Sequence, residues 1–90
     1  MANIKSAQKR IRQNEKRRDR NRAVRSEMRN AVKRVQRAIE AGEVDKAEEL
    51  LPEAIRVIDV TARKNVVHPN KAARSKSRLI QAVRRAKASA

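Results

Sequence analysis

Apolar side chains divide the first 41 residues of the chain into two unlike halves. Residues 12–22 contain no apolar side chain, whereas from residue 23 onward apolar residues recur at the spacing of one helical face: Val24, Met28, Ala31, Val32, Val35, Ala38 and Ile39. Neither proline nor glycine interrupts residues 5–41. The sequence therefore predicts one helix over this range, about 55 Å long, after a short extended lead at residues 1–4. Through residues 12–22 this helix must face water or a polar partner.

A second amphipathic segment covers residues 44–64, after the single glycine of the chain. We expect Gly42 to end the first helix in the left-handed conformation. Pro52 removes one helical hydrogen bond, but the apolar period continues across it, so a kinked helix is favoured over two separate helices. The apolar face is a narrow stripe with three residues that widen it: Val44, Ala47, Leu51, Ile55, Ile58 and Ala62, then Leu50, Ala54 and Val57.

Residues 65–69 interrupt the helical pattern and predict a turn. Asn65 tolerates a positive φ, and Pro69 disfavours the helical conformation for His68 before it. A third helix is predicted to begin at Pro69, or just after a cap at Asn70, and to run to about Ala88. Its apolar residues face one way: Ala72, Leu79, Val83 and Ala86.

These elements predict an all-α fold. Short connections make successive helices antiparallel, so residues 23–88 are expected to form a three-helix bundle. The basic first half of the long N-terminal helix, residues 1–22, would project beyond the bundle; it is called the arm below. Ninety residues are enough for one domain, so residues 1–90 are read as a single domain made of the arm and a bundle of residues 23–90.

Charge is distributed unevenly along the chain, whose net charge is +15. Residues 1–41 carry fourteen Lys/Arg and four Asp/Glu, residues 42–65 carry four and six, and residues 66–90 carry seven and none. Two basic outer segments around a mildly acidic middle indicate a nucleic acid or an anionic membrane as partner. Phe, Tyr, Trp and Cys are absent, which excludes stacking on aromatic side chains, disulfides and thiolate metal sites.

Basic residues in the arm leave no side of the predicted helix free: Lys5, Lys9, Arg10, Arg12, Lys16, Arg17, Arg18, Arg20 and Arg22. In the second half of the helix they form one row opposite the apolar stripe: Arg25, Arg29, Lys33 and Arg37. The third helix carries a similar stripe: Lys71, Arg74, Arg78 and Arg85. Like charges four residues apart repel one another, so such rows favour a polyanion lying against them. We expect the arm to be frayed without that polyanion and helical with it.

Catalysis finds little support in the sequence. His68 has no second histidine or cysteine for a metal site and is best interpreted as a turn histidine that contacts the backbone. The acids of residues 43–49 have the spacing of surface and cap residues, and no glycine-rich phosphate loop is present. The chain is therefore interpreted as a binder, without catalytic residues, metal, cofactor or small-molecule substrate.

Three polyanions compete as the partner. Cations on every side of one helix suit a crevice between several phosphate backbones, which is typical of folded RNA, whereas duplex DNA would be met from one side. A general DNA-binding architectural protein remains the alternative. A basic leucine zipper, a separate DNA-binding hypothesis, would need about four heptads with leucine, and Gly42 stops the pattern after just over two. A membrane-binding helix would carry Trp, Phe or Leu on its apolar face, and residues 5–41 have none.

Three stretches of the chain resemble one known family: residues 1–7 (MANIKSA), residues 38–42 (AIEAG) and residues 68–79 (HPNKAARSKSRL). They are similar to bacterial small-subunit ribosomal protein twenty, and the resemblance covers nearly the whole chain. Asn65 stands where the family is expected to have glycine. The resemblance implies a three-helix bundle that binds 16S ribosomal RNA directly during small-subunit assembly in the cytoplasm, without enzymatic activity.

The resemblance also implies contacts along the long helix and at the start of the third helix. Together with the charge pattern it gives one candidate RNA-binding set, in which the cations of the arm are joined by Arg25, Arg29, Lys33, His68, Asn70, Lys71, Arg74, Lys76 and Arg78. No homo-oligomer and no membrane association are expected.

Overall fold

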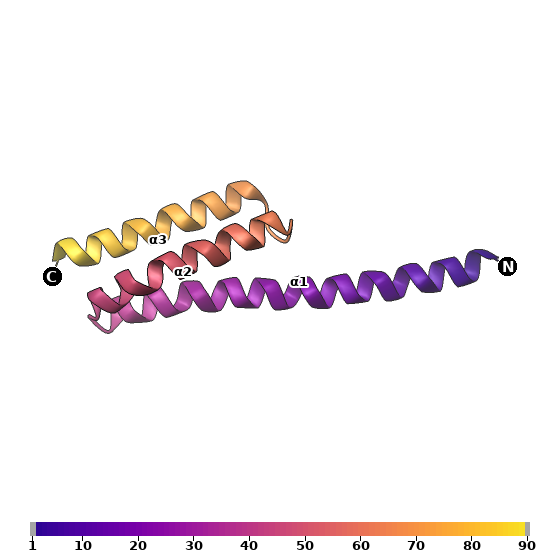
Figure 1. Cartoon of the computed structure of the whole chain (residues 1–90), viewed down its shortest axis with the longest axis horizontal. Coiled ribbons are helices and arrows are strands. Elements are labelled where there is room, and N and C mark those ends of the chain that lie inside the picture. The colour runs from indigo at the N-terminus through magenta and orange to yellow at the C-terminus, as the bar shows by residue number, and fades with distance from the viewer. Residues whose placement is uncertain (1, 90) are drawn as a thin grey trace.

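The computed structural model describes the backbone of residues 2–89 and the side chains of residues 4–89. This part of the chain forms three helices, α1 (Ala2–Glu40), α2 (Val44–Arg63) and α3 (Pro69–Ser89). Figure 1 shows α2 running back along the C-terminal half of α1 and α3 returning along α2. The N-terminal half of α1 extends past the bundle, and the molecule measures 68 × 22 × 14 Å along its principal axes. The predicted all-α bundle with a projecting basic arm is confirmed.

The first helix starts earlier than predicted. Residues 2–4 belong to α1, so the expected extended lead is wrong there, and its remaining residue, Met1, lies outside the described residues. No proline or glycine precedes Ile4, and a helix that is already nucleated propagates readily through such residues. α1 ends at Glu40, one residue before the predicted end.

The turn after α1 has the geometry expected of its glycine. Gly42 has φ +76°, in the left-handed region. Its N–H donates to the carbonyl of Ile39 at 3.0 Å, and the N–H of Glu43 donates to the carbonyl of Ala38 at 2.9 Å. These two bonds form a Schellman motif, which satisfies carbonyls that the helix end leaves free.

Asparagine takes the same role after α2. Asn65 has φ +60°, its N–H donates to the carbonyl of Ala62 at 3.0 Å, and the N–H of Val66 donates to the carbonyl of Thr61 at 3.2 Å. The predicted left-handed turn at Asn65 is confirmed.

The start of α3 is capped by His68 instead of Asn70. The imidazole Nδ1 of His68 accepts a hydrogen bond from the N–H of Asn70 at 3.1 Å, and its carbonyl accepts one from the N–H of Ala72 at 3.1 Å. His68 therefore satisfies one of the free donors at the helix start, and Pro69 occupies the first helical position, where its missing N–H removes no helical bond. The interpretation of His68 as a histidine that contacts the backbone is confirmed.

α2 is the central helix of the bundle and continues through Pro52 as one helix. Its buried residues are Ala47, Ala54, Val57, Ile58 and Thr61, whereas Leu51 and Ile55 of the predicted narrow stripe are half-buried. α2 contacts α1 on one side and α3 on the other. Because α2 packs against two neighbouring helices, its buried residues cover a wider arc of the helix than the predicted narrow stripe. The middle of this arc is displaced from the middle of the stripe.

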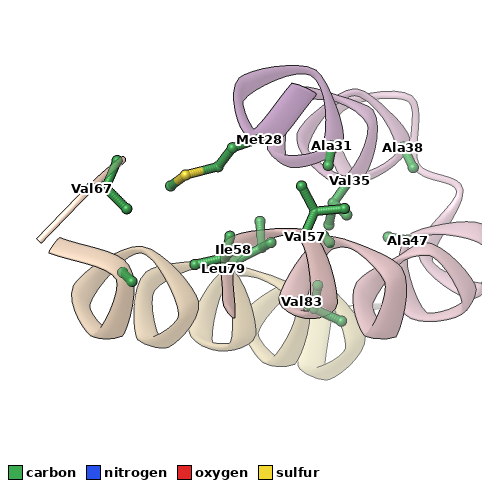
Figure 2. Close-up of a cluster of buried hydrophobic side chains, with 12 residues drawn as sticks. Met28, Ala31, Val35, Ala38, Ala47, Val57, Ile58, Val67, Leu79 and Val83 are labelled. Carbon is green, nitrogen blue, oxygen red and sulfur yellow. The ribbon is translucent and has the colours of Figure 1, made fainter. Parts of the chain in front are cut away.

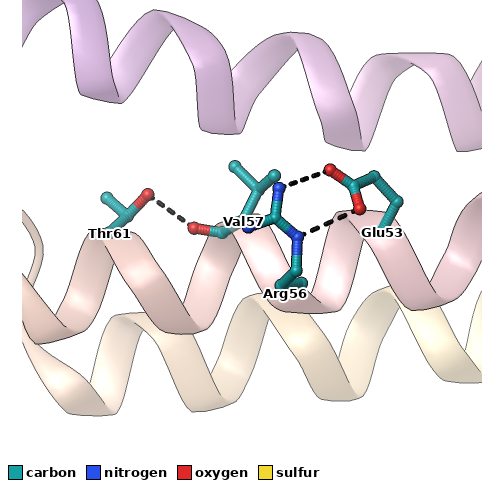
Figure 3. A network of polar contacts seen from close by, with 4 residues as sticks. All are labelled: Glu53, Arg56, Val57 and Thr61. Carbon is teal, nitrogen blue, oxygen red and sulfur yellow. Dashed lines mark hydrogen bonds and ion pairs between the residues drawn. The ribbon is translucent and has the colours of Figure 1, made fainter.

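The core lies between the three helices and is built from small and branched aliphatic side chains (Figure 2): Met28, Ala31, Val35, Ala38, Ala47, Ala54, Val57, Ile58, Val67, Ala72, Leu79 and Val83. Thr61 is the buried polar residue among the described side chains, and the sequence pattern did not predict it in the core. Its hydroxyl Oγ1 donates to the carbonyl of Val57 at 2.7 Å (Figure 3), so its burial leaves no unpaired polar atom.

Ion pairs connect the acidic α2 to its basic neighbour α3. Lys87 Nζ lies 2.9 Å from Glu48 Oε1, and this hydrogen bond raises the pKa of Lys87. Lys76 Nζ lies 2.7 Å from Asp59 Oδ1. Within α2, the guanidinium of Arg56 donates to both carboxylate oxygens of Glu53 (Figure 3), which lowers the pKa of Glu53. The acids of the middle segment are thus partly neutralised inside the protein.

Candidate nucleic-acid interface

The arm presents its cations to solvent in all directions. Every described side chain of residues 4–20 is exposed, including Ile4 and Ile11, which are each 56% exposed. Contact with the bundle begins at Asn21 and Val24, which are half-buried. The nine predicted basic residues of the arm therefore form an exposed cationic rod that extends from one end of the bundle (Figure 1).

The basic row of α1 continues from the arm onto the bundle. Four arginines, Arg18, Arg22, Arg25 and Arg29, line one surface hollow of about 290 Å³. Because they are spaced three or four residues apart, they lie on one side of α1. This row crosses the boundary between arm and bundle without a break.

A second hollow brings the row on α1 against the start of α3. Arg25 and Arg29 from α1 and Lys71 and Ser75 from α3 surround a depression of about 240 Å³, with Met28, Val32 and Val67 also in its lining. We call this depression the α1–α3 hollow. The structure thus places the two regions that the sequence singled out, the long helix and the start of the third helix, on the same face of the bundle.

The groove between α1 and α3 continues beyond this hollow. The adjoining depression, of about 210 Å³, is lined by Val32 and Gln36 from α1 and by Ser75, Arg78, Leu79 and Ala82 from α3. Val32 and Ser75 belong to both depressions. Lys71 and Arg78 therefore stand along one groove, and Lys33 and Arg74 are exposed on the same two helices.

Lys76, another residue of the predicted RNA-binding set, forms an ion pair within the protein. Its ammonium is paired with Asp59 of α2 at 2.7 Å, and its side chain is 32% exposed. Lys76 thus connects α3 to α2, a role that depends on how the helices pack and that the sequence did not indicate. His68 and Asn70 are exposed at the start of α3, where they form the cap described above.

Two further cations lie at the interface that the sequence analysis did not assign. Arg63 and Lys64, at the end of α2, line a depression of about 450 Å³ together with Arg17 and Arg20 of the arm; Asn21, Val24, Asn65 and Val66 complete its lining. The segment that contains them, residues 42–65, is acidic overall, so net charge does not indicate them as contacts. The one feature of the sequence that could have indicated these two cations is their position directly before the predicted turn at Asn65.

Cationic surfaces thus lie on two different sides of α1. Successive residues of an α-helix are turned by about 100°, so Arg17 and Arg20 lie on a different side of α1 from the row that contains Arg18 and Arg22. None of the four depressions described here has Asp or Glu among its described lining residues. Such a surface favours phosphate oxygens, to which Lys and Arg donate charge-assisted hydrogen bonds.

Two other features are absent from the described part of the chain. Residues 2–89 contain no helix that is both long and apolar enough to cross a membrane. The same residues contain no group of three or more His, Cys, Asp or Glu placed to hold a metal ion.

Known proteins similar in sequence cover nearly the whole chain. Residues 2–84 match the family model described as ribosomal protein S20. Small ribosomal subunit protein bS20 of Mycolicibacterium smegmatis is 52% identical over 83 residues, which are 92% of this chain and 96% of that protein. The proteins of the same name from Burkholderia cenocepacia and Burkholderia vietnamiensis are 51% identical over 90 residues, which are the full length of both chains compared.

Proposed function

Since the chain belongs to the ribosomal protein S20 family of the small ribosomal subunit, we propose that it binds 16S ribosomal RNA directly and supports assembly of that subunit. The match to the family model and the identity to its members confirm the family resemblance seen in the sequence. The proposed role is that of a structural constituent of the cytoplasmic ribosome, without catalytic activity, small-molecule substrate or homo-oligomer.

The observation that carries this proposal is the exposed cationic rod of α1. Nine Lys/Arg of the arm have exposed side chains, and the described side chains of residues 4–20 are not buried against the bundle. A helix of this kind fits between phosphate backbones that approach it from several sides, as the backbones of a folded RNA do. Each phosphate that a cation neutralises releases condensed counterions, which favours binding at low salt.

The bundle would fix the direction of the arm relative to the RNA. The groove between α1 and α3 places Arg25, Arg29, Lys71 and Arg78 at defined positions on a packed scaffold. On the other side of α1, Arg63 and Lys64 add a cationic wall next to Arg17 and Arg20. Contacts to phosphate position a protein on a nucleic acid, so a rigid frame of cations would select RNA by shape.

A competition at fixed salt tests the proposal. Folded 16S RNA and random-sequence duplex DNA of equal nucleotide content are offered to the protein, and the two dissociation constants are measured. Folded RNA should bind at least tenfold more tightly. If the nine arm cations each neutralise one phosphate, the slope of log affinity against log salt should be about −6 to −8.

Two results would contradict this proposal. Equal affinity for both polymers would indicate a general nucleic-acid-binding architectural protein. A slope near zero would mean that the cationic rod is not the binding surface.

A further inference from the structure

The α1–α3 hollow combines a cationic rim with an apolar lining. Its rim is cationic, with Arg25, Arg29 and Lys71, but Met28, Val32 and Val67 line it with apolar side chains. Met28 and Val67 are 9% and 8% exposed, the highest values among the residues of the buried core. Figure 2 shows both at one end of that core, on either side of the space between α1 and the start of α3.

An apolar lining beneath a ring of cations suits a ligand that has an apolar part and a negative charge. A phosphate group alone gains nothing from Met28 or Val67, because it would have to give up water to meet them. A regular RNA duplex presents its phosphates and sugars outward while its bases stay stacked. An unpaired nucleotide has both parts, since its base has a flat face that stacks on apolar and guanidinium surfaces and its phosphates flank that base.

On this basis we propose that the α1–α3 hollow accepts the base of an unpaired nucleotide of the bound RNA. Arg25, Arg29 and Lys71 hold the phosphates on either side of that nucleotide. The hydroxyl of Ser75, which also lines the hollow, can donate or accept a hydrogen bond at the edge of the base. This inference rests on the proposed RNA-binding function and adds a contact to a base to contacts with the backbone.

Size and composition agree with this occupant. The hollow has a volume of about 240 Å³, and an apolar cavity of about 150 Å³ is known to hold benzene, so there is room for a nucleobase. The chain has no Phe, Tyr or Trp on which a base could stack, which leaves apolar side chains and arginine planes as the surfaces available. No acidic residue lines the hollow to repel the flanking phosphates.

The shortage of aromatic rings provides a direct test by methyl NMR. The imidazole of His68 is the single aromatic ring of the protein, so a ring-current shift that the base-containing ligand causes and a base-free ligand does not must come from a nucleobase. The probes are a single-stranded adenylate decamer and an abasic ribose-phosphate decamer with the same charge. Both should bind at low salt through the arm, as reported by the amide signals of residues 5–20.

The adenylate decamer should shift the methyl signals of Met28 and Val67 upfield, and the abasic decamer should leave them in place. The methyls of Val35 and Ile58, which have no exposed surface, serve as the internal control and should not move. Equal methyl shifts with both decamers, or no shift at Met28 and Val67 while the adenylate decamer is bound, would overturn the inference and leave the proposed function standing. Failure of both decamers to bind, under conditions where folded 16S RNA does bind, would also overturn the inference, whereas failure of folded 16S RNA itself to bind would refute the RNA-binding function.

A matched pair of variants tests the hollow without changing the charge. Ser75→Leu fills the hollow, whereas Ser77→Leu makes the same change on the same helix at an exposed position outside its lining. Ser75→Leu should weaken binding of the adenylate decamer about fivefold to tenfold and leave binding of the abasic decamer unchanged. Ser77→Leu should affect neither. The ratio of the two affinities within one variant removes any general loss of stability, so an unchanged ratio in Ser75→Leu would count against the base-binding hollow.

Discussion

RNA binding should change the stability of the arm far more than that of the bundle. The perturbation is the addition of one equivalent of folded 16S RNA at low salt. In α1 the arm is helical, yet every described side chain of residues 4–20 is exposed, so no tertiary burial supports that helix. The free energy of arm formation must then come from local terms alone.

Those local terms nearly cancel. Helix propagation contributes between zero and about 0.3 kcal/mol per residue even for good helix formers, which at the middle of that range is about 2.4 kcal/mol for residues 5–20. Four pairs of cations lie four residues apart, Lys5–Lys9, Arg12–Lys16, Lys16–Arg20 and Arg18–Arg22, and each is unfavourable by about 0.2–0.5 kcal/mol. Glu15 and Asp19 offset part of this repulsion. The free arm should therefore lie within about 2 kcal/mol of the coil, whereas a folded bundle is stable by at least about 5 kcal/mol.

Amide hydrogen exchange measures this difference residue by residue. In the free protein, residues 5–20 should be protected less than about thirtyfold, while Val35 and Ile58 in the core should be protected more than about a thousandfold. On RNA the arm should gain at least tenfold in protection and the core should change little by comparison. The double variant Glu15→Gln with Asp19→Asn removes the compensating acids and should lower the protection of the free arm further. Protection of the free arm equal to that of Val35 would refute this reasoning.

Four variants test the scaffold and the contact residues separately. Val35→Asp buries an unpaired charge at a position with no exposed surface and should lower the free energy of unfolding by at least about 3 kcal/mol in a urea titration, whereas Gln36→Asp, one residue further on and exposed, should change it by less than about 1 kcal/mol. Gly42→Ala should lower the melting temperature, because a residue with a Cβ atom is strained by about 1–2 kcal/mol at φ +76°. No atom lies within 4 Å of the added Cβ, so backbone strain is the whole effect and no clash adds to it. Replacing both Arg74 and Arg78 with Gln should preserve the circular dichroism spectrum and weaken binding to 16S RNA severalfold; loss of helicity with normal RNA binding would mean that the core and contact faces have been exchanged.

Local features of the sequence were enough to predict the helices and the turns between them. Gly42 and Asn65 end their helices because each can hold a positive φ, and the two hydrogen bonds of each turn join residues close in sequence. The arm was predictable for a related reason. Residues 12–22, its second half, have no apolar side chain with which to dock on a core, so their exposure depends little on how the helices pack.

Relations between helices were decided by the tertiary structure. Thr61 is buried because α2 lies between two neighbours, and its hydroxyl is satisfied by the Val57 carbonyl one turn earlier. The register of α3 on α2 places Lys76, whose contact with RNA stays a prediction, against Asp59, and the sequence did not indicate this pairing. Arg63 and Lys64 belong to an acidic segment by sequence, yet the end of α2 lies beside the arm.

The physical reason for this division is the range of the interactions. Helix periodicity, caps and left-handed turns depend on residues within about five positions of one another, and the sequence displays these directly. The partner of a charge and the depth of a side chain depend on which faces of separate helices meet, and that is set by packing of side chains far apart in the chain. The sequence alone therefore determined the elements, the bundle and the exposed basic arm, while the tertiary structure decided which cations stand free and where they converge.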